Sequence, residues 1–125
     1  MNNNRVEFKV IEEQRVVVAT IKGTTYDAIN VFNSKFLAHA TSSLVIDDMW
    51  VKNRNQKFFM PHSMKAVARC IPEDEFSVEK GKQIALKKLS EKYNKSLDRH
   101  LKHIHDDMKK CLDNMEVYLK RHKMI

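Results

Sequence analysis

Three histidines beside two aspartates form the group of residues best suited, by type, to metal or acid–base chemistry. His100, His103 and His105 precede Asp106 and Asp107, and imidazole nitrogens and carboxylate oxygens are both common metal ligands. On a regular helix His100 and His103 share one face, whereas His105 points elsewhere. Two ligands on one face do not complete a metal site, so we expect neither a bound metal nor another cofactor.

The two cysteines and the familiar catalytic motifs give no sign of an enzyme. Cys70 is expected in a strand as a small buried residue, and Cys111 falls within an apolar helical stripe. Neither has a convincing partner that would activate a thiolate. The sequence contains no GxSxG, no Walker A lysine and no GxGxxG. We therefore expect a protein without catalytic residues.

Length and composition indicate one folded domain over residues 1–125. The chain is 42% hydrophobic and 31% charged, which is typical of folded soluble proteins. Two cysteines cannot supply a disulfide framework. No apolar run is long enough to cross a membrane, and Met1–Arg5 has no signal-peptide core. We expect a cytoplasmic protein with no membrane partner.

Residues 1–71 have the pattern of β-strands. Val6–Ile11 alternates weakly and Val16–Ile21 is β-branched, and the polar Glu12–Gln14 between them predicts a hairpin. Residues 24–32 fit either a strand or a short helix. Further strands are expected at residues 44–51, 57–60 and 64–71. The sum is about five short strands in an antiparallel meander.

Residues 72–122 have the pattern of a helix. Apolar side chains recur at steps of three or four, which places them on one face: Leu86, Leu89, Tyr93, Leu97, Leu101, Ile104, Met108, Cys111, Met115 and Tyr118. The stripe fits one long helix or two helices joined near Asn94. The predicted fold is α+β, with an N-terminal antiparallel sheet followed by one or two long C-terminal helices.

The apolar stripe is longer than a small sheet can bury. We therefore expect a homo-oligomer, a dimer or higher, in which the stripes of two copies meet. The alternative is a helical hairpin that folds back onto its own sheet.

The junction of the two parts reads as a strand-to-helix corner. Pro72 begins a turn, and Asp74 or Ser77 can cap the helix that follows. Phe76 can anchor the corner between sheet and helix. Gly81 permits a close approach of the helix backbone, either to the sheet or to a ligand.

The same corner carries a resemblance to a known group of proteins. Ala66, Ala68-Arg69-Cys70, Pro72-Glu73-Asp74 and Phe76, then Gly81-Lys82 and Ile84-Ala85, resemble a signature of small phage and prophage proteins of Gram-positive hosts. In these proteins a short sheet with a Val-rich first strand precedes an A-x-C-x-P-x-D-x-F corner and a helical tail. The first family of Thoeris anti-defence proteins, the nucleotide sponges, is similar in size and layout. Its members bind signals of the cyclic ADP-ribose type and keep them from the defence effector.

The resemblance implies a phage anti-defence protein in the host cytoplasm. It would sequester a small cyclic nucleotide signal of the cyclic ADP-ribose type without catalysis. A pyrophosphate needs cations and an adenine needs an aromatic face. The residues expected to contact this ligand are Arg69, Phe76, Lys82, Arg99 and Lys102, with Arg99 or Lys102 supplied by a second subunit.

Two other functions fit the same sequence. An inhibitor that binds a host defence protein directly, as anti-CRISPR proteins do, would present a broad exposed patch instead of a cleft. A nucleic-acid-binding accessory protein would use the basic second part, where residues 79–125 hold 13 Lys and Arg against 7 Asp and Glu. The acids interrupt a continuous track for phosphates, so this function ranks last.

Overall fold

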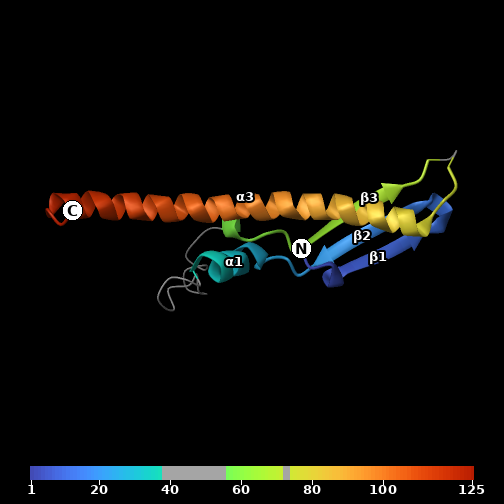
Figure 1. Cartoon of the computed structure of the whole chain (residues 1–125), viewed down its shortest axis with the longest axis horizontal. Coiled ribbons are helices and arrows are strands. Elements are labelled where there is room, and N and C mark those ends of the chain that lie inside the picture. Colours follow the sequence, from blue (N-terminus) through green and yellow to red (C-terminus); the bar gives the residue numbers. More distant parts are fainter. Residues whose placement is uncertain (38–55, 72–73) are drawn as a thin grey trace.

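A small sheet lies against the first half of one long helix, so the predicted α+β fold is confirmed (Figure 1). The computed structural model describes residues 1–37, 56–71 and 74–125. The strand predicted at 44–51 lies outside the described residues. None of the described helices is both long and apolar enough to cross a bilayer.

The sheet has three antiparallel strands in the order β1-β2-β3. β1 (Val6–Ile11) and β2 (Val16–Lys22) form the predicted hairpin, and β3 (Ser63–Arg69) pairs with the other edge of β2. The hairpin turn is a single 3₁₀ turn, η2 (Glu12–Gln14), closed by Arg15 in the left-handed region at φ 53°. The described residues thus form three strands where the sequence predicted about five.

One predicted strand is replaced by a tight turn. Residues 57–60 were expected to be extended, but Gln56–Phe58 forms the 3₁₀ turn η4. Phe58 and Met60 are buried in two different clusters, Phe58 against Ile104 and Met60 against the sheet. The turn lets Phe58 and Met60 reach two different clusters. Core packing therefore overrides the strand propensity of this segment.

The main core lies between the sheet and α3 (Val78–Arg121). Side chains alternate along a strand, so Val17, Ala19 and Ile21 of β2 share one face, and all three are fully buried. They meet Ala85, Leu89 and Tyr93 of the helix, together with Met64 and Ala68 of β3. Alanines on both sides of the interface let the helix lie close to the sheet.

α3 runs unbroken for 44 residues, about 66 Å at the usual helical rise. The alternatives of two helices or a helical hairpin are therefore wrong. Ser77 caps the helix by accepting a hydrogen bond from the Lys80 N–H at 3.2 Å. Asn94 falls in the middle without a break, because neither proline nor a glycine pair interrupts the helix there.

A second cluster covers the middle of α3. Residues 24–32, which fitted either a strand or a helix, include the short helix α1 (Asp27–Phe32). Ile29 of α1 packs with Phe58 and Ile104, and Met108 borders this cluster. Beyond it α3 extends past both α1 and the sheet (Figure 1). The sheet, α1 and η4 of the same chain pack against the stripe as far as Met108, and the homo-oligomer stays a prediction.

Candidate functional site

A pocket of about 410 Å³ lies where β3 ends and α3 begins. Its walls come from residues 68–71, from residues 74–77, and from Lys80, Gly81 and Ile84 on the first turns of the helix. This volume falls within the range of about 300–1,000 Å³ that is usual for small-molecule sites. The corner that carries the sequence resemblance is therefore also a concave surface.

Two residues fix the start of α3 against the sheet. Phe76 is half-buried and packs against the main core while also lining the pocket. Gly81 lies so close to β2 that a Cβ atom on it would stand 2.6 Å from Cγ2 of Val17. The predicted close approach at Gly81 is thus an approach to the sheet. Together the two contacts set the shape of the pocket wall.

Arg15 ties the hairpin turn to the same corner. Its Nη2 donates hydrogen bonds to the Asp74 carbonyl and, at 3.3 Å, to the Cys70 Sγ. In return the Cys70 N–H donates to the Arg15 carbonyl at 3.0 Å. Arg15 Nε is buried and has no hydrogen-bond partner within the described part of the chain. Sequence reasoning missed this residue, although the antiparallel hairpin places it next to the end of β3.

The structure brings together two of the five predicted ligand-binding residues, Arg69 and Phe76, both of which line the pocket. Successive side chains of a strand point to opposite faces. Because Ala68 of β3 faces the helix, the Arg69 side chain points to the other face of the sheet and borders the pocket from there. Lys80, which the sequence reasoning did not select, lines the pocket one helical turn after Phe76.

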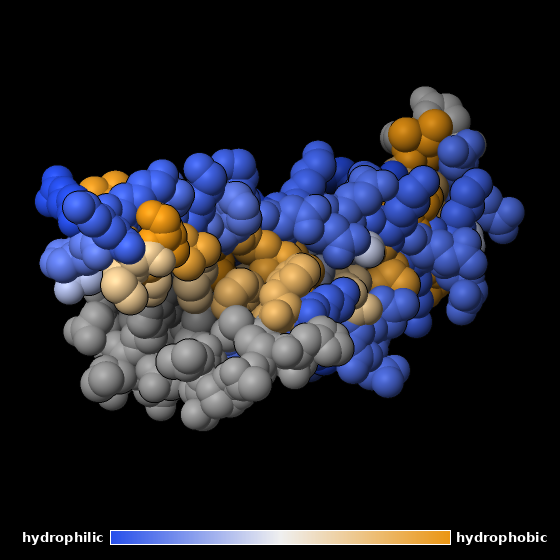
Figure 2. All heavy atoms as spheres, turned by 60° about the vertical axis from the view of Figure 1, so that its left-hand side comes forward, coloured by the Kyte–Doolittle hydropathy of each residue, from blue (hydrophilic) through white to orange (hydrophobic). Residues whose placement is uncertain are grey.

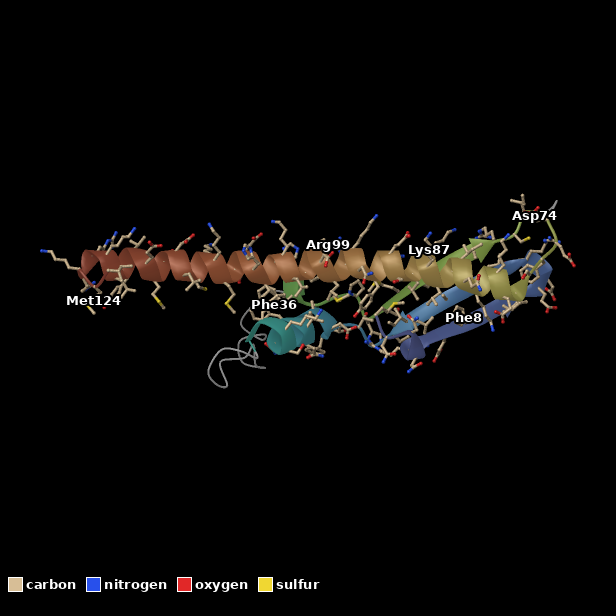
Figure 3. All side chains as sticks on the ribbon, viewed as in Figure 1. Phe8, Phe36, Asp74, Lys87, Arg99 and Met124 are labelled. Atoms are coloured by element: carbon tan, nitrogen blue, oxygen red, sulfur yellow. The ribbon has the colours of Figure 1, made fainter. Side chains whose placement is uncertain are left out.

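The other three predicted residues lie elsewhere. Lys82 holds its ammonium 5.7 Å from the centroid of the Phe8 ring on β1. Two residues advance a helix by about 200°, so Lys80 and Lys82 face nearly opposite directions. Arg99 stands halfway along α3, far from Asp74 at the corner (Figure 3). Lys102 pairs with Asp106 at 3.0 Å. Within one chain, therefore, Arg69 and Phe76 line the pocket together with Lys80, while Lys82, Arg99 and Lys102 lie away from it; the supply of Arg99 or Lys102 by a second subunit stays a prediction.

Comparisons with protein-family models, with curated proteins and with solved structures find no match to this chain. What the pocket can bind follows from its own side chains. Lys80 offers a cation, Phe76 an aromatic surface, and Asp74 and Glu75 offer carboxylates. A ligand that joins an anionic group, a flat ring and hydroxyl or amine donors finds a partner for each part.

The histidine run is used for local contacts. His100 is buried with Nδ1 2.6 Å from the Ser96 carbonyl, which requires a proton on that nitrogen. His105 is exposed and holds Nδ1 3.0 Å from Asp106 Oδ1. The hydrogen bonds from His105 and Lys102 lower the pKa of Asp106. Among residues 1–37, 56–71 and 74–125, no three metal-ligating side chains gather into a group.

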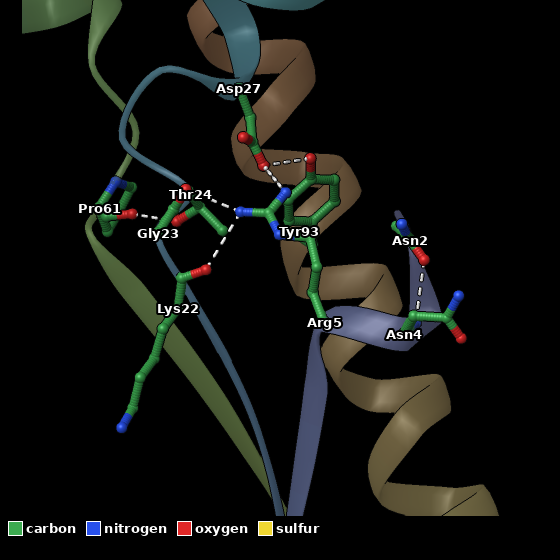
Figure 4. Close-up of polar contacts among 9 residues, drawn as sticks. All are labelled: Asn2, Asn4, Arg5, Lys22, Gly23, Thr24, Asp27, Pro61 and Tyr93. Carbon is green, nitrogen blue, oxygen red and sulfur yellow. Dashed lines mark hydrogen bonds and ion pairs between the residues drawn. The ribbon is translucent and has the colours of Figure 1, made fainter.

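A second polar cluster joins three elements at the other end of the sheet (Figure 4). Asp27 Oδ2 accepts hydrogen bonds from Arg5 Nη1 at 2.8 Å and from the Tyr93 hydroxyl at 2.7 Å. Arg5 Nη2 also donates to the carbonyls of Lys22 and Gly23. Burial, followed by the hydrogen bond to Asp27, raises the pKa of Tyr93 to about 12. These groups already satisfy one another, so we interpret the cluster as a structural clamp.

Proposed function

We propose that the protein binds and sequesters a small nucleotide in the corner pocket without altering it. The observation that supports this most directly is that Phe76 and Lys80 line one pocket of about 410 Å³, with Arg69 at its border. The resemblance of the corner to the phage family extends the proposal. The ligand is then an immune signal of the cyclic ADP-ribose type, and the protein counters host defence in the host cytoplasm.

The side chains of the pocket suit the parts of a nucleotide. Lys80 and Arg69 neutralise phosphate, each contact contributing about 1.5–3 kcal/mol. A base stacked on Phe76 adds about 1–3 kcal/mol. Together these contacts favour binding by roughly 4–9 kcal/mol before ordering costs, and the upper end corresponds to micromolar affinity.

The two acids of the pocket sharpen the choice of ligand. The carboxylates of Asp74 and Glu75 accept hydrogen bonds from ribose hydroxyls or from an exocyclic amine, but they repel additional phosphate groups. We therefore expect a nucleoside-containing ligand to bind more tightly than bare pyrophosphate. A site lined only by cations would show the reverse order.

Binding alone, without turnover, is supported by the sequence, which contains no GxSxG, no Walker A lysine and no GxGxxG. The expected outcome of incubation is a ligand recovered with unchanged mass.

Calorimetric titration of the pure protein tests the proposal. The ligand set is cyclic ADP-ribose isomers, cyclic dinucleotides, ADP-ribose and pyrophosphate, followed by mass spectrometry of the released ligand. Lys80→Gln should weaken binding about tenfold, as expected for one charge-assisted contact, while Lys82→Gln should leave it unchanged. Phe76→Leu should likewise weaken binding, whereas its control, Phe8→Leu, should leave binding unchanged. No binding below about 100 µM, or equal losses for Lys80→Gln and Lys82→Gln, would refute the proposal.

A protein-directed inhibitor is the second candidate, favoured by the exposed apolar residues Leu112, Met115 and Tyr118 near the end of α3. Stoichiometric co-purification with a defence protein, in the absence of nucleotide binding, would support it. Nucleic-acid binding has less support, because the ion pairs Lys102–Asp106 and Lys109–Asp113 neutralise cations along the exposed helix.

A further inference from the structure

β3 ends the sheet on one side, opposite β1 (Figure 1). Within the described part of the chain, no further strand pairs with it. In an antiparallel pair, the main-chain groups of successive residues point alternately toward the partner strand and away from it. The Cys70 N–H donates to the Arg15 carbonyl beside the start of β2, so the N–H and C=O groups of Lys65, Val67 and Arg69 point outward. We call this row of main-chain groups the open edge.

Two lysines of α3 reach over to the open edge. Lys88 Nζ donates a hydrogen bond to the Val67 carbonyl and Lys92 Nζ to the Lys65 carbonyl, each at 3.3 Å. The spacings match, because alternate residues of a strand are about 6.6 Å apart and four residues of a helix rise about 6 Å. Both bonds occupy carbonyls only, and the outward N–H groups of Lys65 and Val67 take no part in them.

The surroundings of the open edge are strongly basic. Residues 63–69 and 84–97 contain six lysines and arginines but only one acid, Glu91. Lys88 and Lys92 are exposed, and neither forms an ion pair with a carboxylate among the residues that the structure describes. Figure 2 shows hydrophilic atoms along the upper side of α3. Cations without a carboxylate partner attract an acidic one.

We propose that the open edge binds an extended acidic segment of another protein, which joins the sheet as a fourth strand. In contacts of this kind main-chain hydrogen bonds supply affinity, and side chains at alternate positions supply specificity. The N–H groups of the segment take over the carbonyls of Lys65 and Val67. Lys88 and Lys92 are then released to contact carboxylates of the segment.

The lysines also decide which strands the open edge admits. A second copy of this chain would bring its own β3 and the same lysines into the contact, and like charges at short range repel. Lysines beside an edge strand commonly prevent pairing between identical chains. A nucleic acid would neutralise the cations, but its phosphate backbone offers only acceptors and cannot pair with the carbonyls of Lys65 and Val67. An acidic polypeptide meets both requirements.

The geometry specifies the sequence pattern of the segment. Met64 and Ala66 of β3 pack toward α3, whereas Val67 lies on the other face of the sheet. Positions of the segment on the α3 side lie beside Lys88 and Lys92, which favours glutamate there. Positions on the other side lie beside Val67, which favours β-branched residues. A segment that alternates glutamate and valine therefore fits the edge.

This contact is separate from the corner pocket. None of Lys65, Val67, Lys88 and Lys92 lines that pocket. Binding of an acidic strand and binding of a nucleotide can therefore succeed or fail independently.

Fluorescence anisotropy with the full chain and a labelled, end-blocked peptide TEVEVEVT tests the proposal. We expect a Kd below about 100 µM at low salt and weaker binding as the salt concentration rises. The first control peptide has lysine in place of glutamate. The second keeps the glutamates but carries N-methyl groups on its backbone nitrogens, so it retains the charge without the donors. Neither control should bind measurably.

Variants of the chain separate main-chain pairing from charge. Val67→Pro removes an outward N–H and places a ring on the open edge, but it breaks no hydrogen bond to β2. It should weaken peptide binding at least about tenfold, whereas the matched control Val67→Ala keeps the N–H and should bind nearly as well as wild type. Circular dichroism and thermal melting show whether both variants fold.

A second pair of variants keeps the test valid if Val67→Pro does not fold. Lys88→Gln with Lys92→Gln should weaken peptide binding at least about tenfold. Lys110→Gln with Lys123→Gln removes the same charge, about 33 Å or more along α3 from Lys88, and should change binding little.

Three results would overturn the proposal. The first is no binding of the acidic peptide, including the case in which a single-stranded oligonucleotide binds in its place. The second is equal binding of the N-methylated peptide, which would show attraction by charge alone. The third is an equal loss of binding in the two double lysine variants, which would show that no particular site is used.

Discussion

Gly81 of α3 lies directly against Val17 of β2, closer than any residue with a side chain could lie. A Cβ atom at Gly81 would stand 2.6 Å from Cγ2 of Val17 and 3.3 Å from its Cβ. Val17 is fully buried and cannot swing away. The contact holds the first turns of α3, and with them Lys80 and Phe76, at a set distance from the sheet.

Gly81→Ala should therefore destabilise the protein by about 1–3 kcal/mol through overpacking. In an uncrowded helix the same change would stabilise it by up to about 1 kcal/mol. Urea unfolding of four proteins measures the balance: wild type, Gly81→Ala, Val17→Ala and the double variant. In the Val17→Ala background the added methyl group has room and should cost little or stabilise. A stabilising effect of Gly81→Ala alone would contradict the close contact.

Tyr93 should make stability depend on pH in the alkaline range. The folded chain holds the phenol proton up to a pKa of about 12, whereas an unfolded chain releases it near about 10. The stabilisation is therefore complete below about pH 10 and is lost as pH rises toward 12. The difference in unfolding free energy between wild type and Tyr93→Phe should shrink over that interval. Tyr26→Phe, at an exposed position, should keep the wild-type dependence.

Thr24 should contribute more to the free energy of unfolding than its small side chain suggests. It is fully buried, and its hydroxyl donates to the Pro61 carbonyl across the gap between α1 and β3. Thr24→Val keeps the shape but removes the donor, so we expect a loss of about 0.5–1.5 kcal/mol. Thr20→Val on β2, at a half-buried position, is the control and should change stability little. Equal effects in thermal unfolding would argue against a specific role for this hydrogen bond.

Two leucines on the same helix should differ in their contribution to stability. Leu89 is fully buried, so Leu89→Ala should cost about 2–5 kcal/mol. Leu112 is 63% exposed, and Leu112→Ala should change unfolding of the monomer by less than about 0.5 kcal/mol. Urea unfolding of both variants measures the difference. Similar stability losses for both variants would show that Leu112 is covered within the chain.

Features that depend on neighbours in sequence could be predicted. The β1–β2 hairpin follows from two apolar runs separated by three polar residues, and α3 follows from a stripe of constant spacing with no proline. The corner at Phe76 and the close approach at Gly81 also carry local signals, because a helix cap and a lone glycine are visible in the sequence. In each case a short segment already contains the cause.

Features that join distant segments could not be predicted. Asp27 and Tyr93 are 66 positions apart. Nothing local in either segment indicates that these two side chains form a hydrogen bond with each other. The choice of Lys80 over Lys82 at the pocket depends on the rotation of α3, which Val17 and Gly81 set through packing. Periodicity fixes which residues share a helix face, but only contact with the sheet decides which way that face points.

The extent of the apolar stripe shows the same division. Its spacing from Leu86 to Tyr118 was evident from the sequence alone, and this spacing predicts that the face is covered by other residues. The tertiary structure decides how far along α3 the stripe is covered. The sheet and α1 pack against it as far as Met108, whereas Met115 and Tyr118 are exposed. A hydrophobic pattern records that a face is to be buried, whereas the length of the covering layer depends on how distant segments pack in three dimensions.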